Sequence, residues 1–130
     1  MSILHDLIAV AETAGLGTAA SDLFAGLMPD APDRCAAFQS YGGATPLRTV
    51  PCNTSHEQAA VQIAIRAPTY DDAEAWSYAL WHALTFTNTT VGTTRYLESA
   101  PQQSPFLIRR EQNARPILGF NLYIRCRPSR

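Results

Sequence analysis

Residues 59–84 read AAVQIAIRAPTYDDAEAWSYALWHAL and contain a strand followed by a helix. Val61, Ile63 and Ile65 alternate with polar or small residues, which predicts a strand over residues 59–67 with one buried face. Pro68 ends this strand, and the capping-box-like residues that follow predict a helix from residue 69 to about Thr87. Its expected apolar stripe, which should lie on a sheet, is Ala73, Trp76, Leu80, Ala83 and Leu84. Trp81 falls outside the stripe and is expected to be exposed.

Toward the C-terminus, the pattern predicts three more strands, over residues 94–98, 105–110 and 117–126, after a threonine-rich loop around Gly92. The last of them alternates most strictly between apolar and other residues. We therefore expect a core in which two strands pack against the helix. Its members are Val61, Ile63, Ile65, Leu118, Phe120, Leu122 and Ile124 from the strands and Trp76, Leu80 and Leu84 from the helix.

The N-terminal part predicts an amphipathic helix over residues 2–14, with Ser2 as its N-cap and Gly15 as its stop. A short helical turn is expected to carry Leu23, Phe24 and Leu27 before two prolines end it. A strand follows over residues 34–40. The loop at Gly42-Gly43 could close a hairpin between this strand and residues 47–50.

These elements predict a single domain over residues 1–130 of the α+β class. Because short turns join the consecutive strands, the sheet should be mainly antiparallel, with the helices packed on one face. A chain of this length can bury a real core. Neither a secretory signal nor a membrane span is visible, so the three cysteines are expected to be free thiols.

No motif in the chain indicates an enzyme, a cofactor or a metal site. The cysteines have no Cys-x-x-Cys or paired-histidine spacing, which leaves a zinc site without support. The glycines at positions 15 and 17 match a loose dinucleotide pattern. They follow a helix where that site needs a strand, so they are better explained as a helix stop and turn.

Charge is distributed unevenly along the chain, although the formal net charge is only −1. Residues 1–74 carry nine acids and three arginines, a net of −6, whereas residues 75–130 carry seven arginines and two acids, a net of +5. All the fixed cations are arginines, which suit bidentate pairing with carboxylates. Acids that cap helices and arginines that line strands would explain this asymmetry. So would a head-to-tail assembly in which an acidic face meets a basic one.

Several short segments, in their order and spacing, resemble those of the tail terminator and minor capsid proteins of long-tailed bacteriophages. The segments are Pro29-Asp30-Ala31-Pro32-Asp33, Tyr41-Gly42-Gly43-Ala44-Thr45-Pro46, Val61-Gln62-Ile63-Ala64-Ile65-Arg66, the helix with Tyr70 and Ala73, Phe106-Leu107, and Phe120-Asn121-Leu122-Tyr123-Ile124. Together they span nearly the whole chain.

The resemblance implies a non-enzymatic virion protein that forms a ring, commonly a hexamer, at the joint between tail and head. Such a ring docks on the last ring of tail tube protein, ends tube polymerisation and presents a surface to the head connector or head-completion protein. Assembly would occur in the host cytoplasm. DNA could pass through the ring, but no sequence-specific nucleic-acid binding and no membrane partner are expected.

The charge pattern supplies candidate residues for contacts between subunits. They are the acids Asp71, Asp72 and Glu74 and the arginines Arg109, Arg110 and Arg125. Two rival functions stay open at this point. One is a neighbouring phage role, as a head-completion or tail-tube protein. The other is a small ligand-binding or enzymatic α+β domain, which would need a deep pocket with convergent polar groups.

Overall fold

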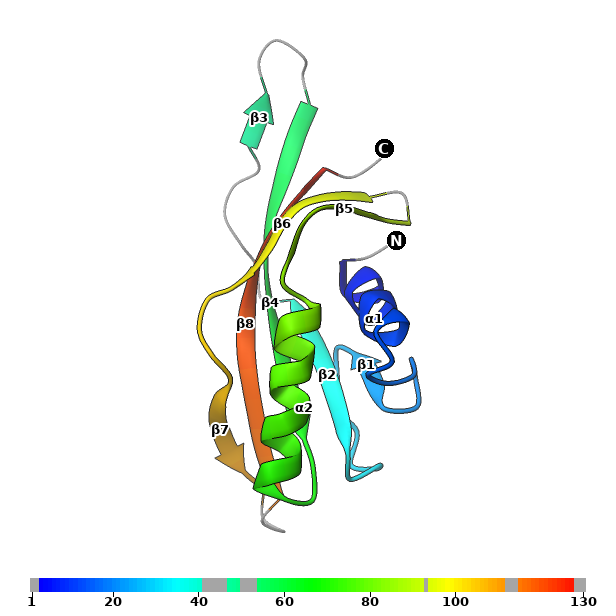
Figure 1. The fold of residues 1–130 in the computed structure, drawn as a ribbon, viewed down its shortest axis with the longest axis vertical. Helices are drawn as coiled ribbons and strands as arrows, with labels where there is room; N and C mark the ends of the chain where they lie inside the picture. The colour runs from blue at the N-terminus through cyan, green and yellow to red at the C-terminus, as the bar shows by residue number, and fades with distance from the viewer. Residues whose placement is uncertain (1–2, 41–46, 50–53, 93, 112–114, 128–130) are drawn as a thin grey trace.

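Strands β4 (Thr54–Arg66) and β8 (Pro116–Arg127) form the centre of the sheet in the computed structural model (Figure 1). They pair antiparallel over ten residue pairs, from Glu57 opposite Cys126 to Arg66 opposite Ile117. The structure describes residues 3–40, 47–49, 54–92, 94–111 and 115–127. Within these residues the fold is one domain with two helices and a curled, mostly antiparallel sheet, as the α+β prediction required.

The other strands add to both sides of the central pair. The order of the strands in the sheet is β1–β2–β4–β8–β6–β5. The strands beside the central pair are β1 (Leu23–Ala25), β2 (Cys35–Ser40), β6 (Thr94–Pro101) and β5 (Phe86–Val91). Only the β1–β2 pair is parallel among the pairs that the structure describes. On its far side, β8 pairs with β6 from residue 122 onward and with β7 (Phe106–Arg110) over residues 116–119. The same edge of β8 therefore pairs with β7 along its first residues and with β6 along its later ones.

Gly119 allows β7 to approach β8 closely. A Cβ atom at this position would lie 2.6 Å from the Ile108 side chain and 2.7 Å from the backbone oxygen of Ile63. The β7–β8 register shifts between Leu107 and Arg109, so Ile108 is the extra residue of a bulge. A glycine in the middle of a strand often marks such a close contact.

Helix α1 (Ile3–Thr13) ends as the sequence predicted. The amide of Leu16 donates to the carbonyl of Ala11 at 3.0 Å, and the amide of Gly15 donates to the carbonyl of Glu12 at 2.9 Å. These two bonds, with Gly15 at φ +76°, form a Schellman motif. The glycine is thus a helix stop.

Helix α2 (Tyr70–Ala83) begins at its predicted cap but ends before Thr87. The Thr69 hydroxyl accepts a hydrogen bond from the Asp72 amide at 3.3 Å, and Leu84 caps the other end. The predicted exposure of Trp81 is wrong. Its ring is half-buried and its Nε1 donates to the carbonyl of Gln103 at 3.0 Å, because the β6–β7 connection lies beside the helix.

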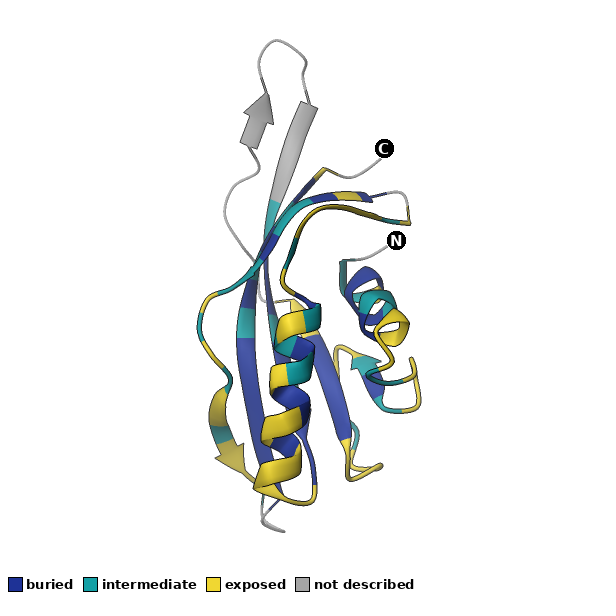
Figure 2. Ribbon diagram, in the orientation of Figure 1, coloured by how far each residue is buried: buried dark blue, intermediate teal, exposed yellow. Residues whose placement is uncertain are grey.

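All ten residues of the predicted core are buried (Figure 2). Nine of them belong to one cluster, which α1 joins through Leu7, Ile8 and Ala11, whereas Leu118 packs with Ala67 and Ala73. In the apolar stripe of α2, Ala83 is only half-buried. Helix α2 contacts β8 and β4, and α1 contacts β1 and β2. The packing of both helices on one face stays a prediction.

Two predictions about the N-terminal half are wrong. Leu23 and Phe24 lie in β1, where the chain is held parallel to β2, and Gly26 at φ +93° prevents the helical continuation that Leu27 would need. Strand β3 (Leu47–Thr49) pairs with β4, so it forms no hairpin with the strand at 34–40. The expected loop at Gly42-Gly43 lies outside the described residues.

The sequence analysis also missed β5, because it assigned the first residues of this strand to the preceding helix and the others to a threonine-rich loop. The segment Phe86–Val91 contains three threonines and is mostly exposed, so it lacks the apolar alternation of an inner strand. It is an edge strand that pairs with β6. Threonine is β-branched and favours extended backbone, which is the signal that could have indicated it.

A buried hydrogen bond joins α1 to β6. The Tyr96 hydroxyl donates to Asp6 Oδ2 at 2.6 Å, and both residues are buried. Burial, together with the hydrogen bond to Asp6 and its negative charge, raises the pKa of Tyr96 far above its ordinary value. The neutral phenol is therefore the form that the fold stabilises.

We predict that Phe120→Ala lowers the free energy of unfolding by about 3 to 5 kcal/mol, because it leaves a cavity beneath α2. Leu107→Ala is the matched control: Leu107 is 41% exposed, and its truncation should cost less than about 1 kcal/mol. Urea unfolding of the two variants measures both values. If Phe120→Ala unfolds at the same urea concentration as the wild type, the strand register given above is incorrect.

We also predict that the free energy of unfolding falls at alkaline pH, because the phenol of Tyr96 ionises more readily in the unfolded chain than in the folded one. The unfolded phenol ionises near pH 10, whereas the folded one keeps its proton, so stability is fully present below about pH 10 and is lost as the pH rises. The expected slope is about 1.4 kcal/mol per pH unit. Urea unfolding at several pH values above 10 should show this slope in the wild type and not in Tyr96→Phe. An equal slope in both proteins would assign the effect to other groups.

Candidate functional site

The candidate acids lie at the start of α2. Asp71, Asp72 and Glu74 are exposed there, where the helix dipole favours negative charge. Asp72 already has a partner in its own chain, since its Oδ2 lies 3.7 Å from Arg34 Nε. The Arg34 guanidinium in turn lies over the Trp76 ring, 3.8 Å from its centroid. Both explanations of these acids, helix capping and contact with a neighbour, therefore remain compatible with their position.

The candidate arginines divide into two groups. Arg109 and Arg110 are exposed at the end of β7, at the same end of the molecule as the start of α2 (Figure 1). Arg125 lies farther along β8, and its NH2 group is 3.7 Å from Glu98 Oε1. The structure thus brings Arg109 and Arg110 to one exposed strand end and gives Arg125 an internal partner.

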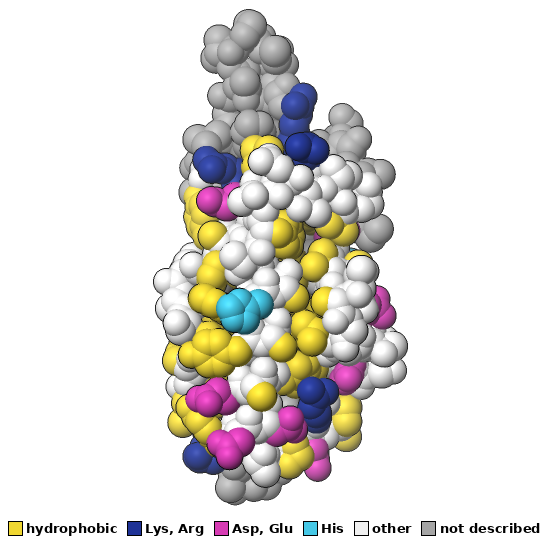
Figure 3. Space-filling view, in the orientation of Figure 1, with side chains coloured by type: hydrophobic (Ala, Val, Ile, Leu, Met, Phe, Trp, Pro, Cys, Tyr) yellow, Lys and Arg dark blue, Asp and Glu magenta, His cyan; other side chains and the backbone are white. Residues whose placement is uncertain are grey.

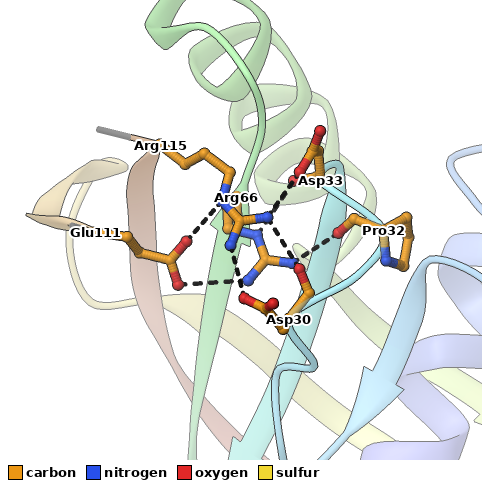
Figure 4. A network of polar contacts seen from close by, with 6 residues as sticks. All are labelled: Asp30, Pro32, Asp33, Arg66, Glu111 and Arg115. Carbon is orange, nitrogen blue, oxygen red and sulfur yellow. Dashed lines mark hydrogen bonds and ion pairs between the residues drawn. The ribbon is translucent and has the colours of Figure 1, made fainter. Parts of the chain in front are cut away.

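The sequence analysis missed the largest polar cluster that the structure describes, which is shown in Figure 4. Arg66, the last residue of β4, is only 1% exposed. Its Nε donates to the carbonyl of Asp33 at 3.2 Å and its NH2 to the carbonyl of Pro32 at 2.6 Å. Its NH1 lies 3.4 Å from Glu111 Oε2. The guanidinium therefore joins the end of a central strand to the loop before β2.

Arg115 extends this cluster. Its NH1 donates to Asp33 Oδ1 at 2.7 Å and to the carbonyl of Asp30 at 2.9 Å, and its NH2 donates to Asp30 Oδ1 at 3.0 Å. Its Nε lies 2.9 Å from Glu111 Oε1. Desolvation lowers the pKa of the Arg115 guanidinium, but the hydrogen bonds to Asp33 and Asp30 and the charge of Glu111 outweigh it and raise that pKa.

These five side chains point at one another, and we therefore interpret them as a structural clamp. The clamp is Asp30, Asp33, Arg66, Glu111 and Arg115. Two cations face three carboxylates, so the clamp carries a formal charge of −1. The sequence signals were weak: Arg66 lies among the polar or small residues of an alternating strand, and Arg115 is one of the seven arginines of residues 75–130.

An open groove of about 520 Å³ lies between α1 and the β5–β6 hairpin. Its lining residues are Ala9, Val10, Thr13, Ala14, Thr89, Thr90, Val91 and Gly92, and they include no titratable side chain. The groove therefore lacks the convergent polar groups that the ligand-binding or enzymatic alternative requires.

The cysteines that the structure describes are not at a reactive site. Cys35 and Cys126 form no disulfide and both are buried, and burial raises the pKa of the Cys35 thiol. Cys52 lies outside the described residues. Within the described ranges, no three His, Cys, Asp or Glu side chains are placed to hold a metal ion. Neither helix is long and apolar enough to cross a membrane in the part of the chain that the structure describes.

We predict that Arg66→Met lowers the free energy of unfolding by about 3 kcal/mol or more, because it removes a buried guanidinium from its carboxylate and carbonyl partners. Arg95→Met is the matched control, since Arg95 is exposed on β6; it should change stability by less than about 1 kcal/mol. Chemical denaturation measures the difference. Equal stabilities of the two variants would refute the clamp.

The comparisons with known proteins give the family. Residues 12–127 match the family described as "Bacteriophage tail terminator protein". No curated protein matches the chain at a significant level. A similar solved structure is a chain of the "Virion of native gene transfer agent (GTA) particle", with a TM-score of 0.64 and 11% identity over 95% of this chain and 91% of that one. At this identity the likeness shows the fold. Because the family match covers most of the sequence, this chain belongs to the bacteriophage tail terminator protein family.

Proposed function

We propose that copies of this protein form a closed ring, commonly a hexamer, on the last ring of the tail tube. The ring ends tube polymerisation and presents a joining surface to the head connector or head-completion protein. The observation that carries this proposal is the family match over residues 12–127, which gives a structural role in the phage tail. The match also favours termination over the head-completion and tube roles.

The fold is suited to such an assembly. A ring needs two different complementary surfaces on each subunit, because a head-to-tail contact repeats until the rotation closes. Arg109 and Arg110 give one surface exposed positive charge at the end of β7. Exposed carboxylates of a neighbour, with Asp71, Asp72 and Glu74 as the candidates, would face them.

The proposal includes no catalytic turnover and no cofactor. The clamp residues bond to one another, and the lining of the groove between α1 and the β5–β6 hairpin has no titratable side chain. DNA passing through the ring would need no sequence-specific contact. The expected partners are other copies of the chain, the tube protein and the head connector, at the head–tail junction of the virion.

The proposal predicts that Arg109→Glu with Arg110→Glu yields a folded protein that does not assemble. The reversal places like charges across the joint, whereas one lost surface pair alone is worth only about 0 to 1 kcal/mol. Rising salt should weaken the wild-type ring for the same reason. Arg95→Glu with Arg127→Glu is the matched control: it makes the same change of charge at two exposed, paired positions of β6 and β8.

The measurement is tail length and head joining when each protein is added to polymerising tails, with native mass measurement of the ring. Wild type and the control should cap tails at normal length, and the reversed variant should not. If the reversed variant folds and still caps tails normally, the charged joint is incorrect while the terminator function stands. If wild type changes neither tail length nor head joining, the proposed function fails.

A further inference from the structure

Three arginines lie together on the face of β6 and β8 that points away from the core. Tyr96 of β6 and Cys126 of β8 are buried in the core cluster. Because successive side chains of a strand point to opposite faces of the sheet, Arg95, Arg125 and Arg127 lie on the other face. Arg95 and Arg127 are exposed, and the side chain of Arg125 is 41% exposed. We call these three residues the arginine face.

Two of the arginines are direct cross-strand partners. Arg95 of β6 lies opposite Arg127 of β8 in the register of the sheet. Residues opposite each other in an antiparallel pair have Cβ atoms about 5 Å apart, and like charges at such positions destabilise the pair. Folding alone does not require two cations here. A sequence that breaks a local rule of stability in this way often does so at a functional site.

Little negative charge surrounds the arginine face. A bulge in β6 brings Glu98 opposite Arg125, and Glu98 Oε1 lies 3.7 Å from the NH2 group of that arginine. The Nε of Arg125 is buried and has no hydrogen-bond partner among the residues that the structure describes. Gln58 and Thr90, the neighbours on β4 and β5, are uncharged. Three cations and one carboxylate give this surface a formal charge of +2.

The other acids of the chain lie mostly at the opposite end of the molecule. In Figure 3, acidic side chains gather around the start of α2 and the loops beside it, whereas they are sparse around β6 and the end of β8. At physiological salt, charges more than roughly 8 Å apart are largely screened from each other. These acids therefore do little to offset the arginine face.

The arrangement fits an anion with several charges at regular intervals. Arg125 and Arg127 are two residues apart on one strand, which is about 7 Å, and Arg95 lies across from the second. Guanidinium groups bind phosphate oxygens in a bidentate manner. A single carboxylate could pair with one of these arginines, whereas the phosphates of a nucleic-acid backbone can pair with all three.

The surface favours a duplex over a single strand. Sites for single strands stack the bases on exposed aromatic side chains. Among the described residues, the large aromatic side chains that are exposed are Tyr70, Tyr78 and Phe106, and they belong to α2 and β7. The arginine face therefore offers charge without a stacking platform.

We propose that the arginine face binds the phosphate backbone of duplex DNA without reading its bases. The side chains that make the contacts are the guanidinium groups of Arg95, Arg125 and Arg127. The inference extends the proposed ring, in which every subunit would present the same face to one duplex and weak contacts would add up. The site itself belongs to each chain.

Titration of a fluorescently labelled, mixed-sequence duplex with the full chain tests this site. Anisotropy gives Kd at salt concentrations between about 25 and 300 mM. Three phosphate contacts predict that log Kd rises with log salt concentration with a slope of roughly three. Arg95→Gln should weaken binding severalfold at low salt and lower the slope by about one. Arg34→Gln is the matched control, since it removes an exposed arginine beside α2, and it should change neither value.

Heteronuclear NMR then locates the bound duplex. The Nε–Hε signals of Arg95, Arg125 and Arg127 should shift when the duplex is added, and those of Arg109 and Arg110 should not. Absence of binding at low salt, or shifts confined to Arg109 and Arg110, would overturn the inference. Equal binding of polyglutamate at the same concentration of charge would also overturn it, because the carboxylates of a protein would then be sufficient.

Tail capping separates this inference from the proposed function. Arg95→Gln with Arg127→Gln should cap tails at normal length and lose affinity for the duplex. A loss of capping in this folded variant would assign the arginine face to a joint between proteins and overturn the inference. If wild type caps tails but does not bind the duplex, the inference alone fails. If wild type binds the duplex through these arginines but changes neither tail length nor head joining, the proposed function fails and the DNA site stands.

Discussion

The antiparallel pairing of β4 with β8 is the constraint on which the other elements depend. One face of this pair supplies most of the core, and α2 lies against it. Its edges then determine where the shorter strands go: β2 and β3 on β4, and β6 and β7 in succession on β8. Because Gly119 lacks a side chain, Ile108 can lie against β8, which places β7 on the outer edge of this strand. The exposed arginines at the end of β7, which we propose as one side of the joint between subunits, thus depend on the central pair.

Buried, paired charges hold the C-terminal end of β4, at Arg66. Arg66 occupies the last position of the strand and donates hydrogen bonds to the carbonyls of Pro32 and Asp33. An apolar side chain at this position could not donate to them. With Arg115 it joins three segments that are far apart in the sequence: the loop before β2, the end of β4 and the turn before β8. Pairing offsets the cost of burying these guanidinium groups only because nearly every donor has a partner. The clamp therefore specifies one arrangement of the three segments.

The sequence was sufficient for elements whose own pattern is strong. Alternation located β4 and β8 and their core residues, and capping signals located the C-terminal end of α1 and the start of α2. Prediction failed where a distant partner decides the structure. Leu23 and Phe24 are apolar enough for either a helix or a strand, and only the neighbouring β2 selects a strand. The clamp depends on contacts across more than thirty positions, as between Arg66 and Pro32, and no local pattern encodes them. The charge pattern likewise identified candidate arginines but not their surroundings in the fold. It therefore could not distinguish Arg125, which lies beside Glu98, from the exposed Arg109.

The clamp also affects the entropy of assembly. Leu27 lies between two points where the backbone is already held, since the Gly26 amide donates to the carbonyl of Phe38 at 2.7 Å and Arg115 binds the carbonyl of Asp30. Much of the conformational freedom of this loop is therefore lost when the chain folds. A subunit arriving at a growing ring would present this loop already ordered, so little further ordering would oppose any contact that the loop makes. A flexible loop with the same residues would bind more weakly, although its contacts in the ring would be identical.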